Sequence, residues 1–428
     1  MEPFKTIGMK RTFLFLSLLW AFTAFAQESL HQILILNEGY TDYLTGEIIE
    51  PVSVGSIDPD TYTYTELFTV DGARFASDLV IDGDRFFVAA DDQLLSYDLN
   101  TYELLASAEV AGIRKIAIWN DQVIVTRGEY LVTLDSHVEV FGREDLNFLY
   151  AINTDDIPYT TEGIAVIDDK AYVAVNNGFD FGNEVGQIAV IDLNSEMLET
   201  TVELGADGIN PDNLMVEDGI IYTLNNKDFT GSSVSTYSPA SGTVATVNLM
   251  NISSGCGTST LREGLVYYQE MFGTSISRFD PASELIVDEN EFGYSFYALS
   301  FEPVSGTMMA TTTDFFSTGS FLVFDDFGAV AHEVAVGVSP GTIAFDVRNA
   351  SAIQEKEIGT LRLYPNPASG SIVVSGNGML RIYNTTGQLV DEQTIVSGQA
   401  DVSALIAGLY TLQLEQDGVI YTSTLVKE

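Results

Sequence analysis

Short runs of alternating hydrophobic and polar residues dominate the chain from Gln32 to about Arg348. The runs are rich in Val, Ile, Tyr, Phe and Thr, and Asp, Asn and Gly residues separate them. Alternation with a period of two is typical of antiparallel strands that bury one face, and the 3.6-residue period of helices is almost absent here. The pattern therefore predicts an all-β fold for this region.

One strand–turn–strand unit recurs along the same region. Its copies are residues 78–90, 115–126, 163–175 and 213–224, with weaker copies that begin at Leu261 and Leu299. A second hairpin with an Asp-rich turn follows the copies, as in the segment 95–101. Four strands per unit, at a spacing of roughly 40 to 50 residues, is the pattern of β-propeller blades. The repeats predict six complete blades.

A seventh blade is predicted from the two ends of the region. Residues 33–36, 52–57 and 62–68 supply three strands, one fewer than a blade needs, and residues 342–347 form an unpaired copy of an innermost strand. Pairing residues 342–347 with residues 33–36 would complete the blade and cover two open sheet edges. We therefore expect a seven-bladed β-propeller over residues 27–348. A β-sandwich of ordinary meanders is the alternative.

The amino end has the layout of a secretory signal peptide. A short basic start at Lys10 and Arg11 precedes an apolar run from Thr12 to Phe22, and the small-x-small site 24–26 follows it. The apolar run is too short for a comfortable membrane span. We predict a signal peptide at residues 1–26 and an exported mature protein.

The composition changes after Arg348. Residues 349–359 are polar and unpatterned, which indicates a linker. Residues 360–428 again contain short alternating runs, with Pro365 and Pro367 placed where an edge strand would end. This pattern predicts a small C-terminal β-sandwich.

The repeats resemble the YVTN-type family of seven-bladed propellers. The stretches that match are 171–177, 186–194 and 337–345, and the Leu-Asn-Glu-Gly at 36–39 looks like the opening of related surface propellers of Bacteroidetes. Some propellers of this kind are outer-membrane capture proteins beside nutrient transporters, including transporters for corrinoids. The resemblance thus implies a surface binding protein with an outer-membrane transporter as a partner.

The C-terminal segment resembles the type A sorting domain that the type IX secretion system of Bacteroidetes recognises. The residues that carry the resemblance are Tyr364, Pro365, Asn366, Pro367, Gly387, Gly408 and Tyr410. It implies contact with the type IX secretion machinery, passage through the outer membrane, and attachment to the cell surface or release. An accessory carbohydrate-binding sandwich is the alternative.

Charge and chemistry exclude several functions. The chain has 61 Asp and Glu residues against 18 Lys and Arg, a net charge of −43, so its surface would repel nucleic acids. Cys256 is the only cysteine, and no pair of the three histidines has metal-ligand spacing. No nucleophile elbow, phosphate loop or dinucleotide motif occurs. We therefore predict no catalytic residue, no metal and no cofactor, although two of the many carboxylates could still meet at glycosidase separation.

One constellation points to a ligand. In a propeller, the connections between the second and third strands of each blade open on the same face as the links between blades, and six of these connections combine an aromatic residue with an amide or acid. We call this the loop face. The predicted ligand contacts on it are Tyr40, Tyr43, Arg74, Arg127, Tyr130, Tyr159, Asn177, Phe179, Phe181, Asn226, Phe229, Phe272, Phe315 and Phe316. The links also bring Arg114, Asn210, Asp212 and Tyr294 to this face.

Three functions fit these residues. Aromatic planes beside planar polar groups suit a sugar ring or another flat, partly polar ligand, which favours non-enzymatic capture of a small molecule or glycan. Alternatively, the aromatic side chains cover the blade cores. Converging carboxylates at the channel mouth would instead favour a hydrolase or lactonase, and a broad apolar patch would favour adhesion to another protein. Arg127 could meet an anionic group or pair with a neighbouring carboxylate.

Overall fold

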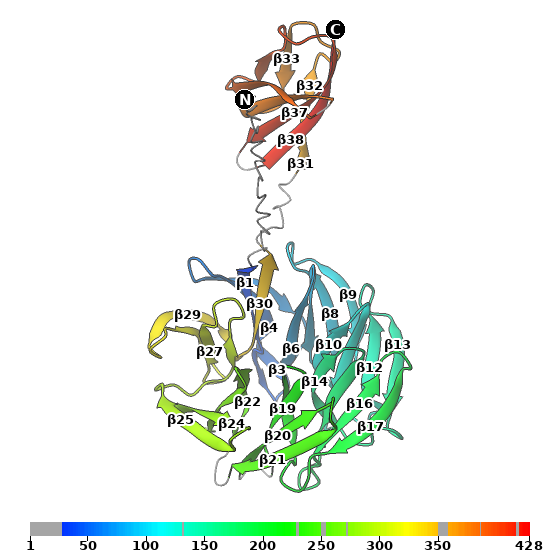
Figure 1. Ribbon diagram of the computed structural model, residues 1–428, viewed down its shortest axis with the longest axis vertical. Helices are drawn as coiled ribbons and strands as arrows, with labels where there is room; N and C mark the ends of the chain where they lie inside the picture. The colour runs from blue at the N-terminus through cyan, green and yellow to red at the C-terminus, as the bar shows by residue number, and fades with distance from the viewer. Residues whose placement is uncertain are drawn as a thin grey trace, which may run out of the picture. The chain divides into compact units, whose positions relative to one another are not determined.

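The computed structural model describes residues 28–130, 132–227, 231–249, 254–270, 273–349, 358–385, 387–416 and 419–428. Every regular element in these ranges is a β-strand (Figure 1). The chain divides into two compact units, Ser29–Arg348 and one that contains Asn349–Glu428. The predicted signal peptide and most of the predicted linker lie outside the described residues.

The unit Ser29–Arg348 consists of four-stranded antiparallel sheets, and the described residues contain seven of them. The first sheet combines strands from both ends of the unit, in the order β30 (Pro340–Asn349), β1 (Glu28–Asn37), β4 (Val52–Asp58) and β5 (Thr63–Val70) (Figure 1). Residues 342–347 thus lie in the strand that is hydrogen-bonded to β1, as the sequence predicts. Next to this sheet, the Glu38 N–H donates to the Ser339 carbonyl oxygen at 2.9 Å.

The other six sheets follow the chain, and each takes four consecutive strands that lie side by side in sequence order. The second sheet has β6 (Ala76–Asp82), β7 (Arg85–Ala90), β8 (Gln93–Asp98) and β9 (Leu104–Glu109), and the third has β10 (Ile113–Trp119), β11 (Gln122–Arg127), β12 (Ser136–Gly142) and β13 (Phe148–Asn153). The fourth sheet has β14 (Thr161–Ile167), β15 (Lys170–Val175), β16 (Gln187–Asp192) and β17 (Met197–Glu203), and the fifth has β18 (Pro211–Glu217), β19 (Ile220–Asn225), β20 (Ser232–Ser238) and β21 (Thr243–Leu249). The sixth sheet has β22 (Ser254–Arg262), β23 (Leu265–Glu270), β24 (Ser275–Asp280) and β25 (Leu285–Glu291), and the seventh has β26 (Leu299–Phe301), β27 (Met308–Thr312), β28 (Thr318–Phe324) and β29 (Val330–Val338). A short hairpin, β2 (Tyr40–Asp42) with β3 (Glu47–Glu50), extends from the connection between β1 and β4.

Asp side chains close the outer turns of the sheets. The Asp98 carboxylate accepts the backbone N–H groups of Asn100 and Thr101 at 2.8 and 2.7 Å, and Asp58 accepts those of Asp60 and Thr61 at 2.9 Å each. These hydrogen bonds lower the pKa of Asp58 and of Asp98. The Asp-rich turns of the sequence are therefore Asx-type turns that fix the hairpins.

The sheets pack against one another in a closed ring. A hydrophobic cluster lies between each sheet and the next, for example Phe87 with Val123 between the second and third sheets. The last sheet packs against the first through Phe321 and Ile33, and a further cluster joins the first sheet to the second. Repeated four-stranded sheets that share cores with two neighbours each are the arrangement of a β-propeller.

The unit that contains Asn349–Glu428 has two sheets around one core. One sheet has the order β31 (Ile358–Thr360), β38 (Val419–Lys427), β37 (Gly408–Gln416), β34 (Gly378–Asn384) and β35 (Leu389–Ile395), and the other has the order β32 (Leu363–Tyr364), β33 (Ser371–Val374) and β36 (Gln399–Asp401). Ile372 of the smaller sheet and Leu412 of the larger sheet belong to the same hydrophobic cluster. No helix in the described part of the chain is long and apolar enough to cross a membrane.

Candidate binding cavity

The first strands of all seven described sheets of the ring line one cavity of about 840 Å³. Loops and links of the predicted loop face complete its wall. The lining residues are Glu38, Tyr43, Arg74, Phe75, Ala76, Ser77, Asp78, Arg114, Lys115, Gly128, Glu129, Tyr130, Glu162, Phe179, Asp212, Asn213, Ser259, Thr260, Tyr297, Ala298, Leu299, Ser300, Gly341, Thr342 and Ile343. A cavity of this size is in the range that holds a small ligand.

An Arg–Glu pair joins two neighbouring first strands at this cavity. Arg114 of β10 donates two hydrogen bonds of 2.9 Å and one of 3.2 Å to the Glu162 carboxylate of β14, which is buried. Burial lowers the pKa of Arg114, but the charge of Glu162 outweighs it and holds this pKa above its ordinary value. The guanidinium carbon also lies 5.3 Å from the centre of the Phe179 ring. The Glu162 carboxylate and the Phe179 ring therefore hold the Arg114 guanidinium in place, and Arg114 remains charged.

Lys115 and Asp78 form a second charged group on the cavity wall. The Ile116 N–H donates to Asp78 Oδ2 at 2.8 Å, and Lys115 Nζ lies 3.9 Å from Asp78 Oδ1. Lys115 Nζ also donates to the Ser77 carbonyl oxygen at 2.7 Å. Burial raises the pKa of Asp78, although Lys115 and the backbone donors oppose this effect.

Glu38 is a carboxyl group of the cavity whose pKa is raised by burial. The Tyr297 hydroxyl donates to Glu38 Oε1 at 2.8 Å, and the carboxyl group lies against Gly341, where a Cβ atom would overlap it. Burial raises the pKa of Glu38 to about 7, although Tyr297, Lys115 and Arg114 each lower it. Glu38 therefore changes its charge near neutral pH.

Aromatic side chains from neighbouring loops contact one another at the edge of the cavity. Tyr130 lies edge-on to Phe179, with ring centres 4.6 Å apart, and stacks on Phe181 at 5.9 Å. Phe179 also packs on Gly128, where a Cβ atom would overlap its ring. The loop between β15 and β16 thus reaches over the loop between β11 and β12, and this contact places aromatic surface beside the charged wall.

Four of the predicted ligand contacts line the cavity: Tyr43, Arg74, Tyr130 and Phe179. The Arg74 guanidinium is held by Asp91, to which its Nε donates at 2.7 Å. Tyr43 and Tyr130 are 71% and 56% exposed, so a ligand can reach part of each residue.

Most of the other predicted contacts lie outside the cavity wall. Phe181, Phe315 and Phe316 are exposed, and Tyr40 lies edge-on to Phe316 with ring centres 5.1 Å apart. Phe229 and Phe272 lie outside the described residues.

Three further predicted contacts have internal partners. Buried Asn177 donates to the Asn183 carbonyl oxygen at 2.9 Å, and buried Asn226 donates to Asp212 Oδ2 at 3.3 Å. Tyr159 packs against a hydrophobic core cluster.

Arg127 takes the second of its two expected roles. Its side chain is buried, its Nε donates to the Ala111 carbonyl oxygen at 2.9 Å, and its Nη1 donates to Ser136 Oγ at 2.7 Å and to Glu139. These bonds use the guanidinium inside its own sheet, and Arg127 does not line the cavity.

The sequence reasoning placed Arg114 and Asp212 on the loop face but did not include them among the ligand contacts, and it missed Asp78 and Lys115. Asp78 and Lys115 are the first residues of the copies 78–90 and 115–126, and Arg114 and Asp212 directly precede the copies 115–126 and 213–224. The signal was their shared position at the start of each copy, which directs them to the ring axis. Among the described residues, no group of three His, Cys, Asp or Glu side chains could hold a metal ion.

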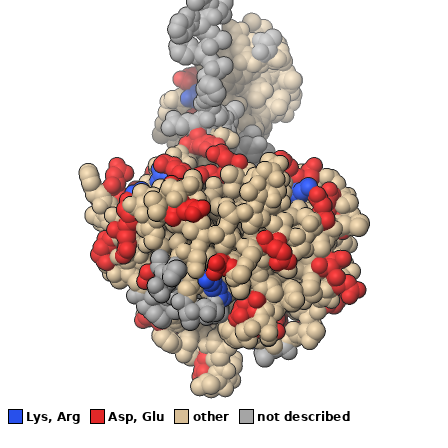
Figure 2. Space-filling view, turned by 60° about the horizontal axis from the view of Figure 1, so that its bottom comes forward, with Lys and Arg blue, Asp and Glu red and all other residues tan. Residues whose placement is uncertain are grey.

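The carboxylates outnumber the cations at the cavity. Glu38, Asp78, Glu129, Glu162 and Asp212 face it, against Arg74, Arg114 and Lys115. Figure 2 shows that Asp and Glu side chains are also scattered over the surface in that view, and that the few Lys and Arg side chains lie beside acidic ones.

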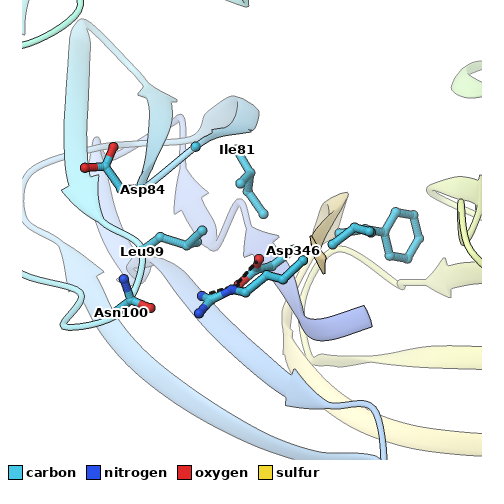
Figure 3. Close-up of a pocket in the computed structure, with 9 residues that line it drawn as sticks. Ile81, Asp84, Leu99, Asn100 and Asp346 are labelled. Atoms are coloured by element: carbon cyan, nitrogen blue, oxygen red, sulfur yellow. Dashed lines mark hydrogen bonds and ion pairs between the residues drawn. The ribbon is translucent and has the colours of Figure 1, made fainter. Parts of the chain in front are cut away.

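A second, smaller cavity of about 430 Å³ lies beside the end of β30. Figure 3 shows Ile81, Leu99 and Asn100 around the Asp346 carboxylate, which accepts a 2.6 Å hydrogen bond from Arg348. Gln32 donates to the same carboxylate at 3.0 Å. The main charged groups of this cavity therefore neutralise each other, which makes it the weaker candidate.

The predicted sorting residues hold the C-terminal unit together. The Asn366 side chain donates to the Thr424 carbonyl oxygen at 2.7 Å and accepts the Val426 N–H at 2.8 Å, so it pairs with β38 like a short strand. Gly387 has φ +78° in the turn between β34 and β35, and Tyr410 donates to the Ile406 carbonyl oxygen at 2.8 Å.

Residues 362–428 match the family described as secretion system C-terminal sorting domain. The protein is therefore exported through type IX secretion, to the cell surface or the medium, and its C-terminal domain interacts with that machinery. This confirms the localisation expected from the sequence.

The whole chain has structural likenesses of low sequence identity. Apo AztD from Citrobacter koseri is 14% identical over 93% of this chain and 99% of its own, with a TM-score of 0.47. BamB from Moraxella catarrhalis is 12% identical over 82% of this chain and 97% of its own, with a TM-score of 0.46. A search of the curated proteins found no match.

Proposed function

We propose that this protein is an exported, seven-bladed β-propeller that captures a small molecule or glycan in the cavity on its loop face. The domain order under this proposal is a signal peptide at 1–26, the propeller at 27–348, a linker at 349–359 and a β-sandwich sorting domain at 360–428. An outer-membrane transporter that receives the ligand is the partner implied by the resemblance to YVTN-type surface propellers.

The observation that supports capture is the cavity of about 840 Å³ with aromatic and charged walls. Tyr43 and Tyr130 are exposed aromatic residues that a ligand can contact, Phe179 supports Tyr130, and the surrounding polar groups can fix the orientation of hydroxyl or amino groups. Since strands from every described sheet of the ring form much of the wall, that part of the wall is ordered before the ligand arrives, which lowers the ordering cost of binding.

A thermal-shift screen of the full chain tests this proposal. The ligands are neutral, anionic and cationic oligosaccharides and planar macrocycles, and a ligand at 100 times its Kd stabilises a protein by about 2.7 kcal/mol. The stabilisation should be lost in F179A and kept in F327A, because the Phe327 ring is 95% exposed and lies outside the cavity. A ligand that stabilises both variants equally would place binding elsewhere, and the absence of any stabilising ligand would refute capture.

A hydrolase is the second candidate, and one observation favours it. Glu38, with a pKa of about 7, shares the cavity with Asp78, whose pKa is also raised, and general acid–base catalysis needs such groups. Capture is preferred because Glu162 is fixed on Arg114 and Asp78 on backbone N–H groups, which leaves Glu38 as the main proton donor. Turnover of a bound ligand by the wild type, and its loss in E38Q, would decide for the hydrolase.

A further inference from the structure

The charges of the cavity wall restrict the class of ligand more than the shape of the cavity does. Five carboxylates and three cationic side chains face the cavity. The three cations already have acidic neighbours, since Arg74 lies on Asp91, Arg114 on Glu162 and Lys115 near Asp78. An anionic ligand would have to compete with these carboxylates, and it would meet a wall with a surplus of negative charge.

Tyr43 lines the cavity together with the carboxylates of Glu38 and Glu129. Burial raises the pKa of Tyr43; Arg74 opposes this effect, while Asp91, Glu38 and Glu129 add to it. Tyr43 is 71% exposed and lines the cavity, so a ligand can reach it. An exposed aromatic ring beside carboxylates is the arrangement that attracts an organic cation, through the ring quadrupole and the charges together.

The cavity also contains an example of this interaction. The Arg114 guanidinium lies over Phe179 while it pairs with Glu162. A cation between an aromatic ring and a carboxylate is thus already stable at this wall. The same combination of ring and acid at Tyr43 and Glu38 offers a second place for a cation, which a ligand could fill.

We infer that the ligand of this cavity is an organic cation, a molecule that carries a protonated or quaternary amine on a sugar-sized scaffold. The inference rests on the proposed capture function and names its ligand class. The ammonium group lies beside Tyr43 and Glu38, and the rest of the ligand lies against Tyr130. The net charge of −43 on the whole chain raises the local concentration of such ligands at low salt.

Three trisaccharides of similar size and different fixed charge test the inference. They are the trimers of N,N,N-trimethylglucosamine, N-acetylglucosamine and galacturonate, which are cationic, neutral and anionic at pH 8. Calorimetric titration of the full chain should show that the cationic trimer binds about fivefold or more tightly than the neutral one. The anionic trimer should bind most weakly.

Two charge-removing variants provide the control. E38Q keeps an acceptor for the Tyr297 hydroxyl and should weaken binding of the cationic trimer at pH 8 more than binding of the neutral one, so that the preference for the cationic trimer is lost. D326N removes the same charge from an exposed turn outside the cavity and should change neither affinity.

Three cationic side chains, Arg114, Lys115 and Arg74, act on Glu38 or Tyr43 and must be considered when the pH is changed. The pKa values of Arg74 and Arg114 are both raised, so these two side chains stay charged from pH 6 to pH 8, and a rise in cation affinity over this range reports on Glu38. Equal or tighter binding of the neutral or anionic trimer overturns the cationic class but leaves capture standing. Binding of none of the three also overturns it, and the wider thermal-shift screen then decides on capture separately.

Discussion

The Tyr297 hydroxyl donates a 2.8 Å hydrogen bond to Glu38 Oε1, although the two residues are 259 positions apart in the chain. Glu38 follows β1 at the beginning of the ring, and Tyr297 precedes β26 in its last sheet. Closing the ring therefore brings a buried carboxyl group and its hydrogen-bond donor together at the cavity.

Stability should fall as pH rises from about 4.5 to about 7, through the ionisation of Glu38. The folded state raises the pKa of Glu38 from 4.5 to about 7, so the folded chain binds more protons than the unfolded chain between these values. The contribution of the protonated Glu38 carboxyl to the free energy of unfolding is complete below pH 4.5 and lost above pH 7. It amounts to at most about 3 kcal/mol. Urea unfolding at pH 5 and pH 8 should show a smaller pH dependence for E38Q than for the wild type. If the free energy of unfolding changes with pH equally in E38Q and in the wild type, the pKa of Glu38 is not raised by folding.

The substitution R114M should destabilise the fold by about 3 kcal/mol, because it leaves the buried Glu162 carboxylate without the cation that neutralises it. The double variant R114M/E162L should recover much of this loss, since the remaining side chains are apolar. Urea unfolding of the two variants and E162L gives the coupling free energy. Additive losses in the double variant would show that the pair is not coupled.

Deleting residues 340–348 should make the protein aggregate. These residues supply β30, and their loss exposes the edge of β1 together with the hydrophobic cluster around Ile33 and Phe321. Deleting the exposed turn 44–46 serves as the control and should leave the protein monomeric. Size-exclusion chromatography with light scattering distinguishes the results, and a monomeric product of the first deletion would contradict ring closure by β30.

The substitution N366A should reduce export. It removes the two hydrogen bonds that tie the segment before Ala368 to β38, each worth about 1 kcal/mol. N377A changes an exposed residue of the same unit and should export normally. Immunoblots of the cell surface and the medium measure both variants, and equal export would mean that the domain is read without this contact.

The sequence could predict the sheets because each strand carries its own signal. The run Phe86–Ala90 is continuous and apolar and becomes a buried second strand, while Leu104–Glu109 alternates and becomes an exposed fourth strand. Even the pairing of β30 with β1 followed from counting strands. The cavity was harder, because Arg127 and Arg114 look alike in sequence. Only the packing shows that Arg127 is bonded within its own sheet and that Arg114 faces the ring axis.

The sheet that joins β30 to β1 also sets an order of events for the nascent chain. No precursor shorter than about residue 348 holds the strand that locks the first sheet, so a polypeptide that emerges amino end first stays an open arc until almost the whole ring sequence is available. The complete export tag, residues 362–428, therefore appears only after the strand that ends at Asn349, so a chain that presents the tag already contains every strand that the ring needs.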